Sequence, residues 1–321
     1  MLFKENILKL PPLLISVIIP TYNSAKYITD TIRSVQAQEW QELEIIVMDD
    51  GSSDNTLSVV RALAAEDSRI KVYQQENGKP AKARNNAVRK AQGAWIALLD
   101  SDDIWLPGKL KLQYELTLNA GVDLSFTDGY ICLKNDMSLR QHRLGVTSSR
   151  YEGENGIQAF HAQNRIPTSS VLMKKSVFYE YGFMPEYPDF PMFAEDYLYW
   201  VQILDKGAKL LGINEALFLY RVHSESTIGE EIRLYPHLLR VMWLLPGERT
   251  IEWKRNLEKT FLKYIYLLND SNAIRNLNPY IKPICSALYG KSKSQVAYIL
   301  WQMSPKLFLS FFWRIRLFKE H

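Results

Sequence analysis

The sequence contains little cysteine and no long apolar run. Its two cysteines, Cys132 and Cys285, lie far apart without CxxC spacing, which excludes a disulfide framework and gives no sign of a structural zinc site. Residues 1–6 lack the basic-then-apolar order of a signal peptide, and no apolar stretch reaches the roughly 20 residues of a membrane span. We therefore expect a cytoplasmic location, and leave open a peripheral position at the inner face of the cell membrane.

Other common patterns are missing as well. No internal repeat or low-complexity tract is visible, and no G-x-G-x-x-G follows the first predicted strand, which argues against a dehydrogenase. At 321 residues, with 47% hydrophobic and 12% aromatic residues, the chain can form a sizeable core. This length allows one large α/β domain with an appendage, or two modest domains.

Charge is distributed unevenly along the chain. Residues 1–233 carry 25 Lys and Arg against 30 Asp and Glu, a balance of −5, whereas residues 234–321 carry 14 against 5, a balance of +9. The second segment is aromatic and predicted to be helical. It either packs on the rest of the protein or places residues 305–319 on an anionic membrane surface. Nucleic-acid binding explains the charge poorly, because no recognised module accompanies it.

The pattern of apolar residues predicts an α/β fold. Up to residue 120, β-branched apolar runs alternate with segments of helical period, which indicates a mainly parallel sheet with helices on both faces. The predicted strands in this part lie at 13–20, 43–48, 70–73 and 95–99. Further strands are predicted at 123–128, 169–173 and 217–220, and further helices at 175–181 and 197–204.

Two of the buried strands end in carboxylates. Asp49 and Asp50 follow one strand, and Asp100, Asp102 and Asp103 follow another. Carboxylates there are costly unless a positive group meets them, and this edge of an open α/β sheet is where ligands bind. Their hard oxygen atoms suit Mg²⁺ or Mn²⁺ together with phosphate oxygens. The alternative is an acidic turn that caps the helix expected after Pro107.

Basic residues begin the helix that lies between these two acidic strand ends. Lys79, Lys82 and Arg84 lie near its N-terminus, where positive charge opposes the helix dipole. Their placement therefore favours binding of an anion over stabilisation of the helix. Together with the acidic strand ends, this pattern predicts a site for a nucleoside diphosphate and a divalent ion.

The same motifs, taken in order, resemble those of the family 2 glycosyltransferases, which have the GT-A (nucleotide-diphospho-sugar transferase) fold. The motifs lie at 16–23, 49–54, 83–85, 99–103, 195–196 and 221–223. The resemblance covers about residues 14–228. It implies a catalytic domain at 1–233, with a nucleotide-binding half at about 14–120 and an acceptor half at about 121–233. The helical region 234–321 has no assigned counterpart.

The resemblance implies roles in donor binding. Pro20 and Tyr22 would flank the nucleobase, and Asp50 would accept a hydrogen bond from its imide, as expected for uracil. Arg84 would lie near the base or the diphosphate. Asp100 would contact the ribose.

The resemblance also implies a metal site. Asp100 and Asp102 would form the DxD pair, with Asp102 as a direct ligand of Mn²⁺ or Mg²⁺. Arg221 and His223 would lie near the metal and the diphosphate, with His223 a second candidate ligand, although a lone histidine can equally be packed. Two roles stay open for Asp103, a place in this site or the cap of the helix expected after Pro107.

On the acceptor side, Asp196 matches the catalytic base of the family, and Glu195 beside it is a second candidate catalytic residue. Two acids that begin a helix also have a purely structural explanation, since they favour the helix dipole. Residues 168–170 resemble a stretch that lines the acceptor, or are simply a polar strand start.

These expectations define an enzyme. It would be an inverting, metal-dependent hexosyl- or N-acetylhexosaminyltransferase of bacterial polysaccharide biosynthesis. The donor would be a nucleotide-diphosphate sugar, with a UDP-sugar as the first expectation. The acceptor would be a hydroxyl of a glycan or lipid-linked glycan. Two alternatives are a polyprenyl-phosphate glycosyltransferase, which needs no general base, and a non-catalytic nucleotide-sugar-binding partner subunit.

Overall fold

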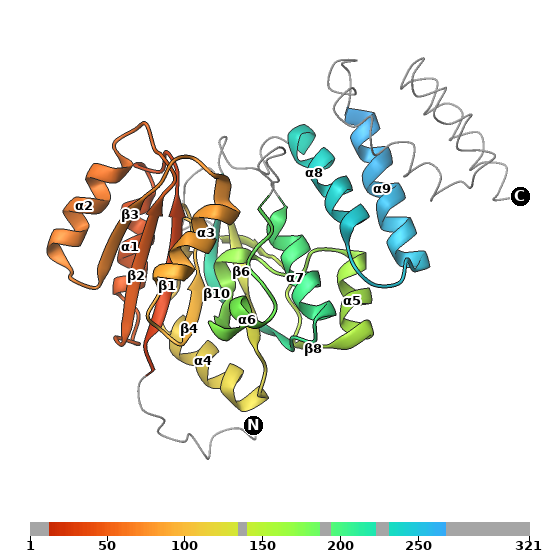
Figure 1. The fold of residues 1–321 in the computed structure, drawn as a ribbon, viewed down its shortest axis with the longest axis horizontal. Coiled ribbons are helices and arrows are strands. Elements are labelled where there is room, and N and C mark those ends of the chain that lie inside the picture. The colour runs from red at the N-terminus through yellow and green to blue at the C-terminus, as the bar shows by residue number, and fades with distance from the viewer. Residues whose placement is uncertain (1–12, 134–139, 187–193, 223–230, 268–321) are drawn as a thin grey trace, which may run out of the picture.

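A single mixed sheet forms the centre of the protein. The computed structural model describes residues 13–133, 140–186, 194–222 and 231–267, and in these the sheet has ten strands (Figure 1). Eight of them lie in the order β3-β2-β1-β4-β9-β6-β10-β5, while β7 pairs with β6 and β8 with β10. The predicted α/β fold class is confirmed.

The first half of the sheet is parallel, as predicted. Its strands are β1 (Ile15–Thr21), β2 (Leu43–Asp49), β3 (Ile70–Gln74) and β4 (Trp95–Leu98). The connecting helices are α1 (Ile28–Gln36), α2 (Thr56–Glu66) and α3 (Lys79–Lys90). Because β1, β2 and β4 run in one direction, their carboxyl ends meet at one edge of the sheet, and the carboxylates that follow β2 and β4 lie there.

The second half is more mixed than the sequence suggested. The short strand β9 (Leu172–Lys174) lies between β4 and β6 (Leu124–Leu133) and is antiparallel to both. Strand β10 (Leu210–Val222) is parallel to β6. Apolar periodicity reveals that a segment is a strand but carries no information about its direction, so β9 could not be oriented from sequence.

The remaining elements surround this half of the sheet. The short strands are β5 (Ile104–Trp105), β7 (Arg140–Arg143) and β8 (Ser149–Tyr151). The helices are α4 (Lys109–Ala120), α5 (Gly153–Ala162), α6 (Ser176–Glu180), α7 (Glu195–Asp205) and the 3₁₀ turn η1 (Thr168–Ser170). Strand β10 is longer than the predicted 217–220, and register shifts between Ile213 and Leu219 interrupt its apolar alternation.

Two apolar layers show that helices cover both faces of the sheet. Alternate residues of β1 divide between them: Val17 packs in the layer that contains α1, α2 and α4, and Ile18 in the layer that contains α3, α6 and α7. This division follows from the period of two in a strand, which sends successive side chains to opposite faces.

Helices α8 (Glu231–Leu244) and α9 (Ile251–Leu267) follow the sheet and pack against each other, α9 beside α5 and α8 beside α7 (Figure 1). Trp253 is buried and its Nε1 donates to the carbonyl of Met242, and Asn256 donates to the carbonyl of His161. Trp253 and Phe261 of this part therefore belong to the core. No helix in the described ranges has the length and apolarity to cross a membrane. Residues 305–319, the candidate membrane-surface helix, lie outside the described residues.

We predict that Gly93→Ala destabilises the protein by at least about 2 kcal/mol, because no side chain fits where β4 approaches β1. A Cβ at Gly93 would lie 2.6 Å from the carbonyl oxygen of Leu14 and 2.8 Å from the nitrogen of Ser16. Urea-induced unfolding measures the effect. Gly121→Asn is the control, because φ there is +61°, which asparagine tolerates, and nothing lies within 4 Å. Equal stability of the two variants would contradict this packing.

Candidate functional site

The carboxyl ends of β1, β2 and β4 surround a cavity of about 440 Å³. We call it the first cavity. Its lining includes most of the residues predicted to bind the donor, namely Pro20, Tyr22, Asp50, Arg84, Asp100 and Asp102. Tyr22 is exposed at 51%, unusual for a large aromatic side chain, and its ring is therefore accessible for stacking.

Asp50 shapes one wall of the first cavity. Its carboxylate is buried and accepts hydrogen bonds from Gln75 Nε2 at 2.8 Å, Gly78 N at 2.8 Å and Lys79 N at 2.9 Å. The bond to Lys79 holds that residue in the left-handed region, at φ +73°. Since a carboxylate offers about four acceptor positions, one remains for a ligand.

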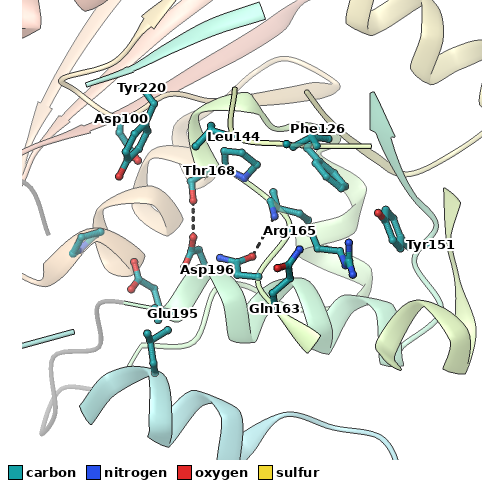
Figure 2. Close-up of a pocket in the computed structure, with 18 of the residues that line it drawn as sticks. Asp100, Phe126, Leu144, Tyr151, Gln163, Arg165, Thr168, Glu195, Asp196 and Tyr220 are labelled. Carbon is teal, nitrogen blue, oxygen red and sulfur yellow. Dashed lines mark hydrogen bonds between the residues drawn. The ribbon is translucent and has the colours of Figure 1, made fainter. Parts of the chain in front are cut away.

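A second cavity of about 440 Å³ lies beside the first. Pro80, Arg84, Asp100 and Tyr220 line both cavities, so the two meet at these residues. Figure 2 shows Asp196 and Thr168 near the junction, with Arg165, Tyr151 and Phe126 farther from it. Tyr220 was not recognised from sequence, although it ends the predicted strand just before Arg221.

Arg84 joins the two halves of the site. Its Nη2 lies 2.6 Å from Asp100 Oδ1 at the end of β4, and its Nη1 lies 3.1 Å from Glu195 Oε1 at the start of α7. Burial alone would lower the pKa of Arg84, but the two carboxylates outweigh it and raise the pKa, so the guanidinium stays charged. Arg84 therefore compensates two carboxylates from distant parts of the chain.

Asp196 faces the second cavity from the first turn of α7. Its Oδ2 accepts a hydrogen bond from Thr168 Oγ1 at 2.7 Å, drawn as a dashed line in Figure 2, and its Oδ1 accepts from Tyr197 N at 2.7 Å. Burial raises the pKa of Asp196, although the bond from Thr168 opposes this. Burial also raises the pKa of Glu195, to about 7. A carboxylate with a raised pKa is a better proton acceptor at neutral pH.

Asp103 is in the lining of neither cavity. Its side chain is buried and accepts hydrogen bonds from Ser169 Oγ at 2.5 Å and Arg221 N at 2.9 Å. It does not cap the following helix, because α4 begins at Lys109 without a side-chain cap. Burial and the nearby Asp102 raise the pKa of Asp103 well above its usual range. Asp103 thus anchors the turn that carries Asp100 and Asp102.

The 3₁₀ turn η1 connects the second cavity to this acidic turn. Thr168 binds Asp196, and Ser169 Oγ both donates to Asp103 and accepts from Asp100 N at 3.1 Å. The carbonyl of Ser170 accepts from side chains on α4. Residues 168–170 therefore position carboxylates of both cavities, a role beyond the two that the sequence suggested.

Arg221 holds the acidic turn through the backbone of Asp102. Its Nε donates to the carbonyl of Asp102 at 2.7 Å, and its guanidinium lies over the ring of Tyr27, 4.8 Å from the centroid. Its side chain is 4% exposed and is in the lining of neither cavity. His223, predicted with it, lies outside the described residues.

Asp100 and Asp102 are the candidate ligands for a divalent ion in this structure. Among the described residues, no three His, Cys, Asp or Glu side chains are grouped as a metal cage. Asp100 and Asp102 nevertheless both line the first cavity. Mg²⁺ is commonly held by one or two carboxylates together with substrate phosphates, so this pair fits an ion that arrives with a diphosphate.

Comparison with known proteins defines the class of this chain. The model of the family described as "Glycosyl transferase family 2" matches residues 16–182. The chain therefore belongs to this family and is a glycosyltransferase, as the motifs predicted.

Particular relatives are bacterial enzymes. The chain is 33% identical over 214 residues to the "Putative teichuronic acid biosynthesis glycosyltransferase TuaG" of Bacillus subtilis, covering 66% of this chain and 81% of that one. It is 33% identical over 221 residues to the Escherichia coli "UDP-Glc:alpha-D-GlcNAc-diphosphoundecaprenol beta-1,3-glucosyltransferase WfaP", covering 68% and 82%. The structure of S. aureus TarS 1–349 in complex with UDP-GlcNAc matches with a TM-score of 0.62 at 18% identity, over 93% and 89%, which shows a shared GT-A fold.

We predict that Ser169→Ala lowers the free energy of unfolding by about 1–3 kcal/mol, because the buried carboxylate of Asp103 loses one of its two donors. Chemical denaturation measures the change. Ser58→Ala is the matched control, since Ser58 is exposed on α2. If both serine variants unfold at the same denaturant concentration, Ser169 does not hold the acidic turn.

Proposed function

We propose that this protein is an inverting, metal-dependent glycosyltransferase that moves a sugar from UDP to a hydroxyl of a lipid-linked glycan. One observation carries the proposal: two cavities meet at Arg84 and Asp100, with Asp102 in the first and Asp196 in the second. A donor in the first cavity and an acceptor in the second would present their reacting atoms to each other at this junction.

The first cavity would hold the nucleotide. Pro20 and Tyr22 would flank the base, and the remaining acceptor position of Asp50 would receive the imide N–H of uracil. The choice of UDP is supported by the UDP-sugars bound by TarS and named for WfaP. Asp100 would contact the ribose, and Arg84 would lie beside the diphosphate.

Asp102, with Asp100, would hold Mn²⁺ or Mg²⁺ against the diphosphate. The ion would supply positive charge for the leaving diphosphate, a recognised contribution of metals to such reactions. Arg221 would act indirectly, by fixing the backbone of Asp102. A role for His223 as a second ligand remains a prediction.

In the second cavity Asp196 would be the general base. It would take the proton of the acceptor hydroxyl as that oxygen bonds to the anomeric carbon, while the bond from this carbon to the diphosphate oxygen breaks. Attack opposite the leaving group inverts the configuration. Glu195, the other predicted catalytic residue, accepts a hydrogen bond from Arg84. We therefore assign to Glu195 the role of positioning that arginine.

The requirement for a general base distinguishes this proposal from the polyprenyl-phosphate alternative. An enzyme that glycosylates polyprenyl phosphate needs no proton acceptor, whereas Asp196 faces the acceptor cavity with its pKa raised by burial. A lipid-linked acceptor is supported by WfaP, whose name includes diphosphoundecaprenol. Work on such an acceptor would place the enzyme at the inner face of the cell membrane, in bacterial polysaccharide biosynthesis.

For donor binding, we predict that UDP binds more tightly than GDP, TDP or CMP, and that EDTA weakens its binding relative to Mn²⁺. Asp102→Asn should remove most of the Mn²⁺ dependence, because it removes a carboxylate charge from the metal site. Isothermal titration measures both effects. Asp205→Asn, at an exposed position at the end of α7, should bind as the unchanged protein does. Equal UDP affinity with Mn²⁺ and with EDTA would contradict the metal site.

For the base, we predict that transfer falls as the pH drops through the raised pKa of Asp196, because only the ionised carboxylate accepts a proton. Thr168→Val should move this acidic limb to higher pH, since the Thr168 bond lowers the pKa of Asp196. The pH dependence of kcat measures the shift.

Asp196→Asn is the reference for loss of the base. It should reduce transfer by about 10²-fold or more while UDP still binds. Full transfer by Asp196→Asn, or an acidic limb unmoved by Thr168→Val, would exclude Asp196 as the base.

A further inference from the structure

Arg165 is a cation that lines the second cavity and forms no ion pair with any carboxylate among the described residues. It follows α5 and precedes η1, and its Nε donates to the carbonyl of Ala159 at 2.7 Å. Within the described part of the chain, neither of its terminal nitrogens has a hydrogen bond or an ion pair. The Nε bond thus holds the guanidinium and leaves its two terminal nitrogens, with four N–H donors, for a ligand.

The charged residues of this cavity gather at its junction with the first cavity, except for Arg165. Four other charged residues line it, all of them at or near the junction: Arg84, Asp100, Glu195 and Asp196. At this end Arg84 is already paired with Asp100 and Glu195, so it is less available than Arg165 to an anion carried by the acceptor. Arg165 lies on the Tyr151 side of Asp196, so the positive charge is displaced from the reacting centre (Figure 2).

The lining around Arg165 combines polar and aromatic side chains. Gln163 and Asn164 directly precede it in the chain, and Phe126 and Tyr151 are stacked, with ring centroids 6.0 Å apart and an interplanar angle of 25°. A ligand that entered from this side would meet aromatic side chains and a guanidinium before it reached Asp196. An acceptor with a hydroxyl at one end and an anion at the other matches this order.

We propose that Arg165 binds the diphosphate that joins the acceptor sugar to its lipid. The inference rests on the proposed function, and it adds an acceptor subsite to it. Arginine suits this role because its planar fork of N–H groups can bind two phosphate oxygens at once. Arg165 is then a specificity-determining residue that selects diphosphate-linked acceptors over neutral glycosides.

The test is titration of geranyl diphosphate into the full chain with UDP and Mn²⁺ at saturation, so that the first cavity is occupied. Geraniol, the same chain without phosphates, is the control probe. Arg165→Gln should weaken the binding of geranyl diphosphate at least tenfold, and Arg165→Lys should weaken it less. The affinity for UDP should be unchanged in both variants, which also shows that they are folded. Arg61→Gln, at an exposed position on α2, is the matched control.

Three results overturn the inference in distinguishable ways. Equal affinity of the unchanged protein and Arg165→Gln for geranyl diphosphate, with UDP binding intact, refutes the role of Arg165 alone. Failure of the unchanged protein to bind geranyl diphosphate beside UDP refutes the diphosphate subsite. Failure to bind UDP at all refutes the proposed function, and this inference with it.

Discussion

The ion-pair cluster around Arg84 is the constraint on which the site depends. Arg84 is 6% exposed and bonds to Asp100 from the sheet edge and to Glu195 from α7, residues that lie 16 and 111 positions away. Loss of one partner from a buried ion pair typically costs about 3–5 kcal/mol, because it leaves an uncompensated charge. The cluster therefore fixes α7, and with it Asp196, relative to the end of β4.

Four aspartates of the site have different roles because their surroundings differ. The Asp50 carboxylate accepts three hydrogen bonds and shapes a loop. Asp103 is buried and anchors the acidic turn. Asp102 remains at the first cavity and Asp196 at the second. The four residues are chemically alike, so their different roles come from burial and hydrogen-bond partners rather than from residue type.

Much of the architecture could be predicted because it depends on local pattern. The parallel strands and the acidic strand ends follow from apolar runs and from the rule that parallel strands share their carboxyl edge. The direction of β9, the anchoring role of Asp103 and the position of Arg221 behind the turn depend on partners far away in the chain. Ser169, for instance, is 66 residues from Asp103, and no local pattern reports such a pair.

The most direct test of the two-cavity assignment is a crystal structure with UDP and Mn²⁺. We expect uracil between Pro20 and Tyr22, hydrogen-bonded to Asp50, and the diphosphate with its ion at Asp102. The β-phosphate should then face the junction at Arg84 and Asp196. A nucleotide bound in the second cavity, against Tyr151 and Arg165, would contradict the assignment of donor and acceptor sides.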